Sequence, residues 1–239
     1  MVHPTHKKFF SKLGRDRQVS ETFRLGLLLA LSGGLMDAYS YLFRGEVFAN
    51  AQTGNILLFS VNLSQGNWGM VKEYGCPVLA FGAGIAIAFL LRQHFQRSLT
   101  RLHWRQLGVL MEIVILAVVA FQPQTRNLLA NSLTSLACGF QVEAFRKIHG
   151  NAIATTMCIG NFRAGLHALG EYWFSHKTSD RNKALTYFIV IAFFAVGAVV
   201  GSRLIAKFGQ WAILCSSVLL LVCFLLMFIQ TEEEKRDAF

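Results

Sequence analysis

Hydrophobic residues along this chain gather into long runs, separated by short polar and basic segments. A membrane-spanning helix needs about 20 consecutive, mostly apolar residues. We expect such a helix at each of six stretches, roughly residues 23–43, 75–92, 104–122, 127–146, 184–205 and 210–230. Pro77 falls in the first turn of the second stretch, where its missing N–H costs little. The pattern predicts an all-α, polytopic membrane protein.

Two further stretches, residues 47–63 and 151–174, are apolar enough to enter a membrane but are interrupted near their middles. Both contain Gly, Asn and Thr there, and the second also carries Arg163 and His167. If both stretches cross completely, the chain has eight spans. If both are re-entrant or broken segments, the chain has about six.

The distribution of basic residues favours six spans, because Lys and Arg concentrate in cytoplasmic loops. The basic residues before the first span place the N-terminus inside. With six spans, the arginine-rich loop 92–105 also falls inside, and few basic residues fall outside: Arg44, Lys72, Arg126, Arg203 and Lys207. Eight spans would divide the charges more evenly. We therefore expect a multi-pass protein whose N- and C-termini are both cytoplasmic.

Composition supports a membrane protein and argues against a nucleic-acid partner. Hydrophobic residues make up 54% of the 239 positions and charged residues 15%, against about 25% charged in a typical soluble domain. The mean hydropathy is +0.43. The net charge of +10 comes from basic residues at the ends of apolar runs. A nucleic-acid surface would instead place them on one face or among stacking aromatics.

The chain also contains signs of an internal repeat. Asn55 and Asn161 are 106 positions apart, and the same offset relates Asp37 to Glu143. Further pairs agree, at an offset of 106 or 107: Gly33 and Gly139, Ala38 and Ala144, Tyr39 and Phe145, Gly54 and Gly160, Trp104 and Trp211. Three crossings in each half would invert the second half relative to the first, as in many transporters and channels.

This repeat divides the chain into four parts. We expect a basic cytoplasmic segment over 1–22, a first repeat half over 23–122 and a second over 123–230. A charged cytoplasmic tail follows over 231–239. The re-entrant segment of the first half is 47–63, and that of the second half is 151–174.

The candidate binding site lies where the two interrupted segments meet, because non-helical backbone at membrane depth is tolerated only beside protein or water. Its candidate residues are Asp37, Asn50, Gln52, Thr53, Asn55, Gln141, Thr155, Thr156, Asn161 and Arg163. Asp37 is costly in an apolar run and is expected to accept a proton or a cation. Alternatively, it is a structural residue bonded to Thr53 or Asn55, and the other polar groups only satisfy the broken backbone.

Helices that begin near Gly54 and Gly160 would point N–H groups at a solute, which favours an anion, and Arg163 would add positive charge. Glu143 is explained more simply by an ion pair with Arg146 or Lys147.

We find no enzyme constellation, no metal-ligand spacing and no cofactor motif in the sequence. The chain is therefore not expected to be an enzyme. The expected partners are the lipid bilayer and a small polar or ionic solute. The pattern Gly197–Gly201 favours close helix packing, either within one chain or between two chains of a homodimer.

Several strings in the sequence resemble the YoaK family of bacterial membrane proteins, DUF1275. They are 33–39 (GGLMDAY), 48–55 (FANAQTGN), 139–141 (GFQ), Phe145-Arg146, 154–157 (ATTM) and 160–163 (GNFR). The resemblance extends over about residues 23–229. It implies a multi-pass protein of the bacterial inner membrane but supplies neither a function nor site residues. Many members have Asn after the Gln of the second motif, where this chain has Val142, which argues against a polar role for position 142.

Together these patterns predict a small inverted-repeat transporter or channel. The alternative is a non-transporting scaffold or sensor that acts through its basic cytoplasmic loops, for example by binding anionic lipid with residues 92–105.

Overall fold

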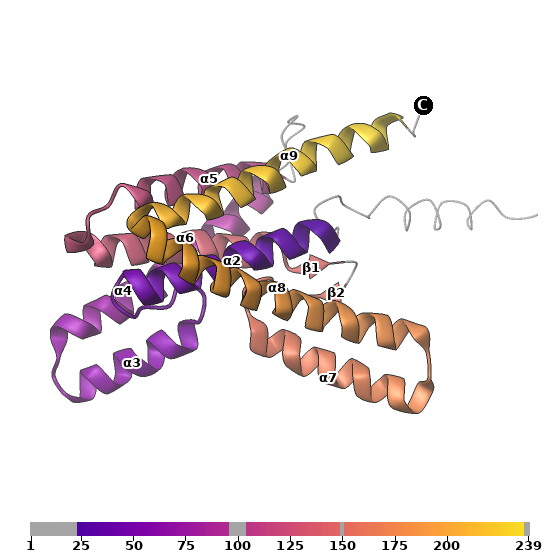
Figure 1. The fold of residues 1–239 in the computed structure, drawn as a ribbon, viewed down its shortest axis with the longest axis horizontal. Helices are drawn as coiled ribbons and strands as arrows, with labels where there is room; N and C mark the ends of the chain where they lie inside the picture. The colour runs from indigo at the N-terminus through magenta and orange to yellow at the C-terminus, as the bar shows by residue number, and fades with distance from the viewer. Residues whose placement is uncertain (1–22, 96–103, 149–150, 237–239) are drawn as a thin grey trace, which may run out of the picture.

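The computed structural model describes residues 23–95, 104–148 and 151–236, with side chains as far as residue 227. Helices dominate these residues (Figure 1). They are α2 (Phe23–Phe43), α3 (Gln52–Ser64), α4 (Trp68–Phe95), α5 (Trp104–Ala120), α6 (Asn127–Ala144), α7 (Cys158–Ser175), α8 (Thr178–Phe208) and α9 (Leu214–Arg236), with 3-10 turns η2 (Gln124–Arg126) and η3 (Gly209–Ile213). A short antiparallel pair, β1 (Lys147–Ile148) and β2 (Asn151–Ala152), follows α6.

Each apolar stretch predicted from the sequence contains or overlaps one long helix. The two interrupted stretches are not unbroken helices: each begins as extended chain and becomes helical only at Gln52 or Cys158. The expectation for Pro77 was wrong. Helix α4 begins at Trp68, so Pro77 lies in its interior and cannot donate the bond that would close that turn.

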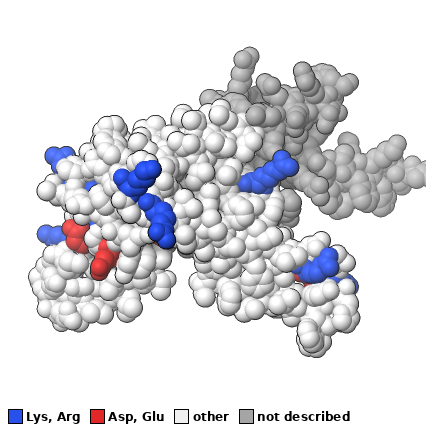
Figure 2. All heavy atoms as spheres, in the orientation of Figure 1, with Lys and Arg blue, Asp and Glu red and all other residues white. Residues whose placement is uncertain are grey.

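Three stretches are long and apolar enough to cross a membrane by length and composition: α2, α4, and Thr178–Met227. The last of these includes α8, η3 and the first part of α9. Large apolar side chains also cover the outside of the molecule. Leu79, Ile159, Trp173 and Phe174 are each at least 75% exposed, and most of the visible face carries no charged side chain (Figure 2). This surface suits hydrocarbon better than water.

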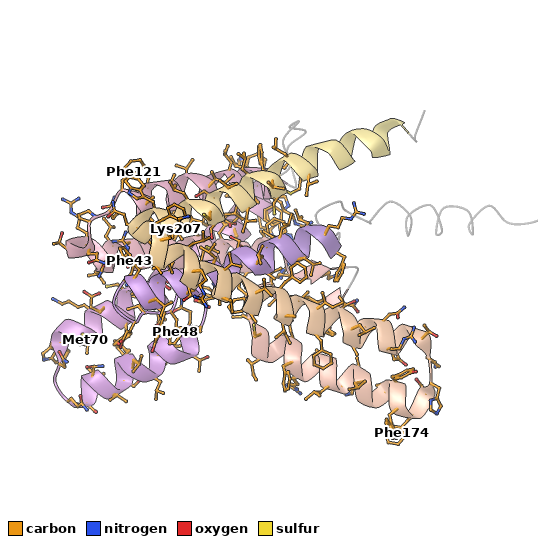
Figure 3. The ribbon with its side chains drawn as sticks, in the orientation of Figure 1. Phe43, Phe48, Met70, Phe121, Phe174 and Lys207 are labelled. Carbon is orange, nitrogen blue, oxygen red and sulfur yellow. The ribbon has the colours of Figure 1, made fainter. Side chains whose placement is uncertain are left out.

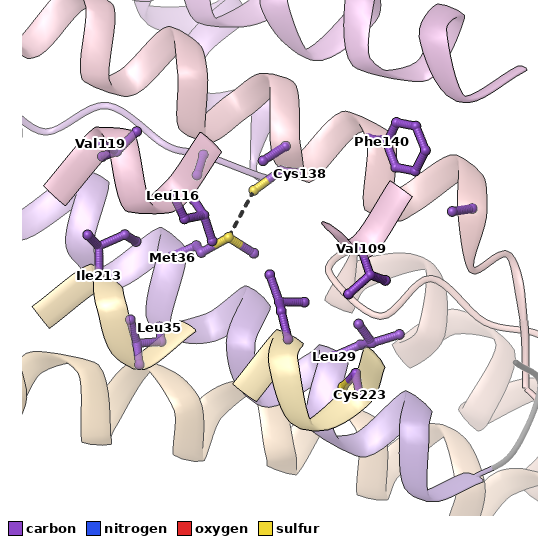
Figure 4. Close-up of a cluster of buried hydrophobic side chains, with 14 of the residues drawn as sticks. Leu29, Leu35, Met36, Val109, Leu116, Val119, Cys138, Phe140, Ile213 and Cys223 are labelled. Carbon is purple, nitrogen blue, oxygen red and sulfur yellow. Dashed lines mark hydrogen bonds between the residues drawn. The ribbon is translucent and has the colours of Figure 1, made fainter. Parts of the chain in front are cut away.

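The helices form a central body with two projecting hairpins (Figure 1). Helix α2 packs along α8, α4 packs along α6, and α5 packs along α9. The hairpins are α3–α4 and α7–α8, and their tips carry Met70 and Phe174 (Figure 3). The main core lies between α2, α5, α6 and α9, where Leu29, Met36, Val109 and Cys138 are fully buried or nearly so (Figure 4).

Glycines allow α2 and α8 to touch backbone to backbone. A Cβ atom added to Gly34 would collide with the carbonyl group of Phe194, and one added to Gly197 would collide with that of Leu31. A Cβ atom added to Gly201 would lie 3.1 Å from the Cα atom of Leu35. The small-residue pattern Gly197–Gly201 therefore packs against α2 within the same chain.

Helices α4 and α6 make the same kind of contact. Gly84 of α4 lies against the carbonyl group of Leu136, and Gly139 of α6 lies against that of Phe81. Both crossings have the same spacing. On each helix, the carbonyl group that faces the glycine of the other helix belongs to the residue three positions before that helix's own glycine. Both crossings exclude any side chain, so each pair is held by close van der Waals contact.

Candidate functional site

The first interrupted segment turns back into the protein after α2. Gly45 and Glu46 have positive φ angles of 89° and 59° and reverse the chain direction. The extended residues that follow run back along α2 to its middle. There, the backbone N–H of Asn50 donates to Oδ1 of Asp37 at 2.7 Å, and Nδ2 of Asn50 donates to the carbonyl oxygen of Gly33 at 3.2 Å. The sequence had suggested Thr53 or Asn55 as partners of Asp37.

The asparagine of the first Gly-Asn pair holds this extended chain in place. Oδ1 of Asn55 accepts the N–H of Phe48 at 3.0 Å, and Nδ2 donates to the carbonyl oxygen of Phe48 at 2.7 Å. Nδ2 also donates to Oε1 of Gln52. The side chain thus replaces the partner strand that Phe48 would have in a sheet, which satisfies backbone groups far from water.

The second Gly-Asn pair repeats this arrangement. Nδ2 of Asn161 donates to the carbonyl oxygen of Ala154 at 2.6 Å, and Oδ1 accepts the N–H of the same residue at 3.3 Å. In both halves the asparagine bonds the residue seven positions earlier and lies in the first turns of a helix. We call each of these two pairs of hydrogen bonds an asparagine clasp.

The two segments meet around the middle turns of α2. Nε2 of Gln141, on α6, donates to the carbonyl oxygen of Leu29 and to Oγ1 of Thr155. The neighbouring Thr156 lies against Gly33, with its methyl group 2.7 Å from where a Cβ of that glycine would stand. Gly33 therefore contacts Asn50 of the first segment and Thr156 of the second.

Three polar atoms at this meeting point are buried without a hydrogen-bond partner among the described residues: Asn50 Oδ1, Gln141 Oε1 and Thr156 Oγ1. Ser32 Oγ, on the residue of α2 that precedes Gly33, is a fourth such atom. All four side chains are at most 4% exposed. An unpaired buried polar group costs about 1–3 kcal/mol, and such groups are rare in folded proteins. We call these four atoms, together with the carboxylate of Asp37, the central polar cluster.

The structure places the predicted site residues in three groups. Asp37, Asn50, Gln141, Thr155 and Thr156 converge on the middle of α2. Gln52, Asn55 and Asn161 are buried and donate hydrogen bonds to backbone carbonyl groups. Nε2 of Gln52 donates to the carbonyl oxygen of Ala49 and, at 3.4 Å, to Oγ of Ser135. Thr53 and Arg163 have exposed side chains outside the cluster.

Ser32, Arg44 and Glu112 are among the buried polar side chains that sequence reasoning missed. The guanidinium of Arg44 donates to the hydroxyl of Tyr39 and to the carbonyl oxygens of Val119 and Gln122, where α5 ends. A cation at a helix C-terminus is favourable, so Arg44 ties α2 to α5. Arg44 lies just beyond an apolar run and Ser32 lies inside one. The sequence pattern does not distinguish either residue as a buried polar group. It does distinguish Glu112, because this residue interrupts an apolar run as Asp37 does.

No group of three or more His, Cys, Asp or Glu side chains that would hold a metal ion occurs in the described part of the chain. The prediction of a Glu143 ion pair is confirmed: its Oε1 lies 3.5 Å from Nη1 of Arg146.

The fold and its surface define a helical membrane protein with a polar cluster inside. Residues 25–226 match the family described as "Protein of unknown function (DUF1275)", and the chain belongs to this family. It is also 27% identical over 183 residues to the "UPF0700 transmembrane protein YoaK" of Bacillus subtilis (strain 168), covering 72% of this chain and 79% of that protein. No solved structure matches the chain.

Proposed function

We propose that this protein is a small membrane transporter or channel. Its solute, small and polar or ionic, would bind near mid-depth between the two Gly-Asn segments. The observation that carries this proposal is the central polar cluster. Its unpartnered atoms need water or a bound solute to offset the cost of their burial. A purely structural interior would pair these groups or replace them with apolar side chains.

We infer an inverted repeat of three spans and one re-entrant segment in each half, an architecture that suits this function. The two asparagine clasps are 106 positions apart, and the two glycine crossings exchange the halves: α2 of the first half packs on α8 of the second, and α6 of the second on α4 of the first. The start of α2 and the end of α9 lie at the same end of the molecule in Figure 1, as six crossings require. Gating would then come from rocking one half against the other.

The proposed location is the bacterial inner membrane, with both termini in the cytoplasm. The support for this orientation is the distribution of basic residues. The segment 1–22, most of the loop 92–105 and the last residues of the tail lie outside the described residues. No catalytic chemistry or cofactor is part of the proposal.

The chemistry of the cluster favours a solute that presents hydrogen-bond donors or positive charge. The amide atoms left without partners, Asn50 Oδ1 and Gln141 Oε1, are acceptors, and the carboxylate of Asp37 accepts only. A protonated or cationic group would satisfy them. Arg163, on the exposed face of α7, stays a proposed anion contact at the edge of the path rather than in the cluster.

Two nearly isosteric variants test the proposal with little risk to folding. Thr156→Val removes a hydroxyl that has no partner in the described structure, and Asp37→Asn keeps an oxygen that can accept the N–H of Asn50. In proteoliposomes supplied with a panel of small cations, amines, amino acids and sugars, both should reduce protein-dependent uptake at least about tenfold, the loss of one or two hydrogen bonds to the solute.

Glu143→Gln is the matched control, because it removes a carboxylate at the related position outside the cluster. It should leave uptake unchanged. Absence of protein-dependent flux for every solute, with tight binding of anionic vesicles, would instead favour the scaffold or sensor acting through its basic loops.

A further inference from the structure

A second carboxyl group lies inside the protein, away from the central polar cluster. Glu112, in the middle of α5, is 0% exposed, and neither of its carboxyl oxygens has a hydrogen-bond partner in the described part of the chain. One turn to either side, Val109 and Leu116 belong to the apolar core (Figure 4). The only ion pairs recorded among the described residues involve other side chains.

The groups that face Glu112 from the neighbouring helices do not compensate a negative charge. Cys138 of α6 and Cys223 of α9 are within electrostatic reach of its carboxyl, and both thiols are buried. Burying an ionised carboxylate without a counter-charge costs several kcal/mol even after relaxation. A neutral carboxylic acid pays only the smaller cost of unpaired polar atoms, about 1–3 kcal/mol. The neutral form is therefore the stable one here.

The fold itself does not require an acid at this place. The offset between Trp104 and Trp211 aligns α5 with the region of α9. In the part of α9 that corresponds to Glu112, the chain carries the apolar residues Leu219 and Leu220. A leucine at position 112 would fill similar space without unpaired oxygens. A residue retained at a cost inside a membrane protein is a functional candidate.

Glu112 is also connected to the central polar cluster. Cys138 lies within electrostatic reach of both Glu112 and Asp37, and its Sγ is 3.8 Å from Sδ of Met36, beside Asp37 (Figure 4). This contact joins α6 to the turn of α2 that carries Asp37.

We propose that Glu112 is a proton-binding residue: its carboxyl is neutral in this conformation and exchanges its proton when the α5–α9 contact opens. Its part in transport rests on the function proposed above. We expect that a cation arriving at Asp37, linked to Glu112 through Met36 and Cys138, favours release of the Glu112 proton, which predicts proton–cation exchange. The released proton passes to water, so no further reactant is needed.

Infrared difference spectroscopy of the full chain in lipid nanodiscs tests the protonation directly. At neutral pH the wild-type protein should show the C=O stretch of a protonated carboxylic acid, shifted in D2O. This band should vanish in Glu112→Gln and persist in the control Glu143→Gln. A wild-type protein without the band, or a band unchanged in Glu112→Gln, would overturn the proposal.

Glu112→Leu guards against a folding artefact. It removes both unpaired oxygens, so its thermal unfolding temperature should equal or exceed that of the wild type. A marked decrease would mean that the carboxyl makes stabilising bonds, which contradicts the proposal.

A flux measurement separates this proposal from the proposed function. Proteoliposomes with a trapped pH-sensitive dye are given an outward gradient of a small cation, chosen as the one the wild type transports. Because exchange brings protons in as cations leave, wild-type protein should acidify the lumen in step with cation efflux. Glu112→Gln should abolish the pH change while cation efflux persists. Equal pH changes in both proteins would refute the coupling. If no cation moves with wild-type protein, transport fails, and the infrared band alone decides the protonation of Glu112.

Discussion

The two Gly-Asn segments share one structural device but differ in their chemistry. Both use an asparagine clasp on the residue seven positions earlier. Beside the first segment, Asp37 points to the middle of the protein and binds Asn50. The related acid of the second half, Glu143, instead pairs with Arg146, which is about half exposed. The shared part therefore serves the backbone, and the chemistry is concentrated on the side of the first segment.

The glycines of the two motifs differ in the same way. Gly54 lies under the ring of Phe48, and a Cβ atom added to Gly54 would be 2.8 Å from the nearest ring carbon. The Phe48 ring stacks on that of Tyr41, with 4.8 Å between the ring centroids. Gly160 has nothing within 4 Å of an added Cβ. Packing explains the first glycine. The second stands beside open space at the start of α7, where no packing contact requires a glycine.

The strongest test of the relation between the halves lies in the helix crossings. Gly34→Ala and Gly139→Ala each force a Cβ atom against backbone and should each destabilise the protein by about 3 kcal/mol, the upper end of ordinary overpacking. Equal losses in thermal or SDS unfolding would support equivalent crossings. Gly82→Ala in α4 is the control, because its added Cβ meets nothing within 4 Å. It should be neutral or slightly stabilising, and a large loss there would show that any glycine change in these helices is harmful.

The next test compares the two clasps. Asn55→Ala and Asn161→Ala each leave an N–H and a carbonyl group without partners and should cost about 2 kcal/mol. Asn55 should cost more, since it also binds Gln52. The exposed Asn182→Ala provides the baseline. If one clasp proved dispensable, the backbone role would belong to one half only.

The smallest expected effect distinguishes the two glycines. Gly54→Ala must displace the Phe48 ring and should cost about 1 kcal/mol, whereas Gly160→Ala should gain up to about 1 kcal/mol from helix propensity. Unfolding and uptake should be measured on the same preparations. Reduced uptake with unchanged or higher stability in Gly160→Ala would place the solute path there. Normal uptake would restrict the path to the first segment.

The sequence predicted helices well where apolar runs are long, because membrane helices follow from length and hydropathy alone. The end of α2 at Phe43 was predicted to the residue, whereas α4 was predicted to begin seven positions late, since the charged Lys72 and Glu73 interrupt its first turns. The breaks before the helices that begin at Gln52 and Cys158 belong to the alternative that the distribution of basic residues favoured.

The site was harder to predict than the helices. Composition identifies polar residues in apolar surroundings, but it does not tell which of them bond the backbone. Asn55 and Asn50 looked alike in sequence, yet Asn55 uses both amide atoms on the backbone of Phe48 while Asn50 keeps an oxygen without a partner. The packing role of Gly84 was not predicted, because the sequence does not show which helix lies against α4.

The helix crossings also affect how the chain is made. Gly197 of α8 follows its partner Gly34 of α2 by 163 positions. At a synthesis rate of about 5–20 residues per second, α2 waits on the order of ten seconds or more in the membrane before α8 emerges. During that time its bare glycine ridge is open to other helices. Any helix that binds this ridge earlier must leave it before α8 can pack there.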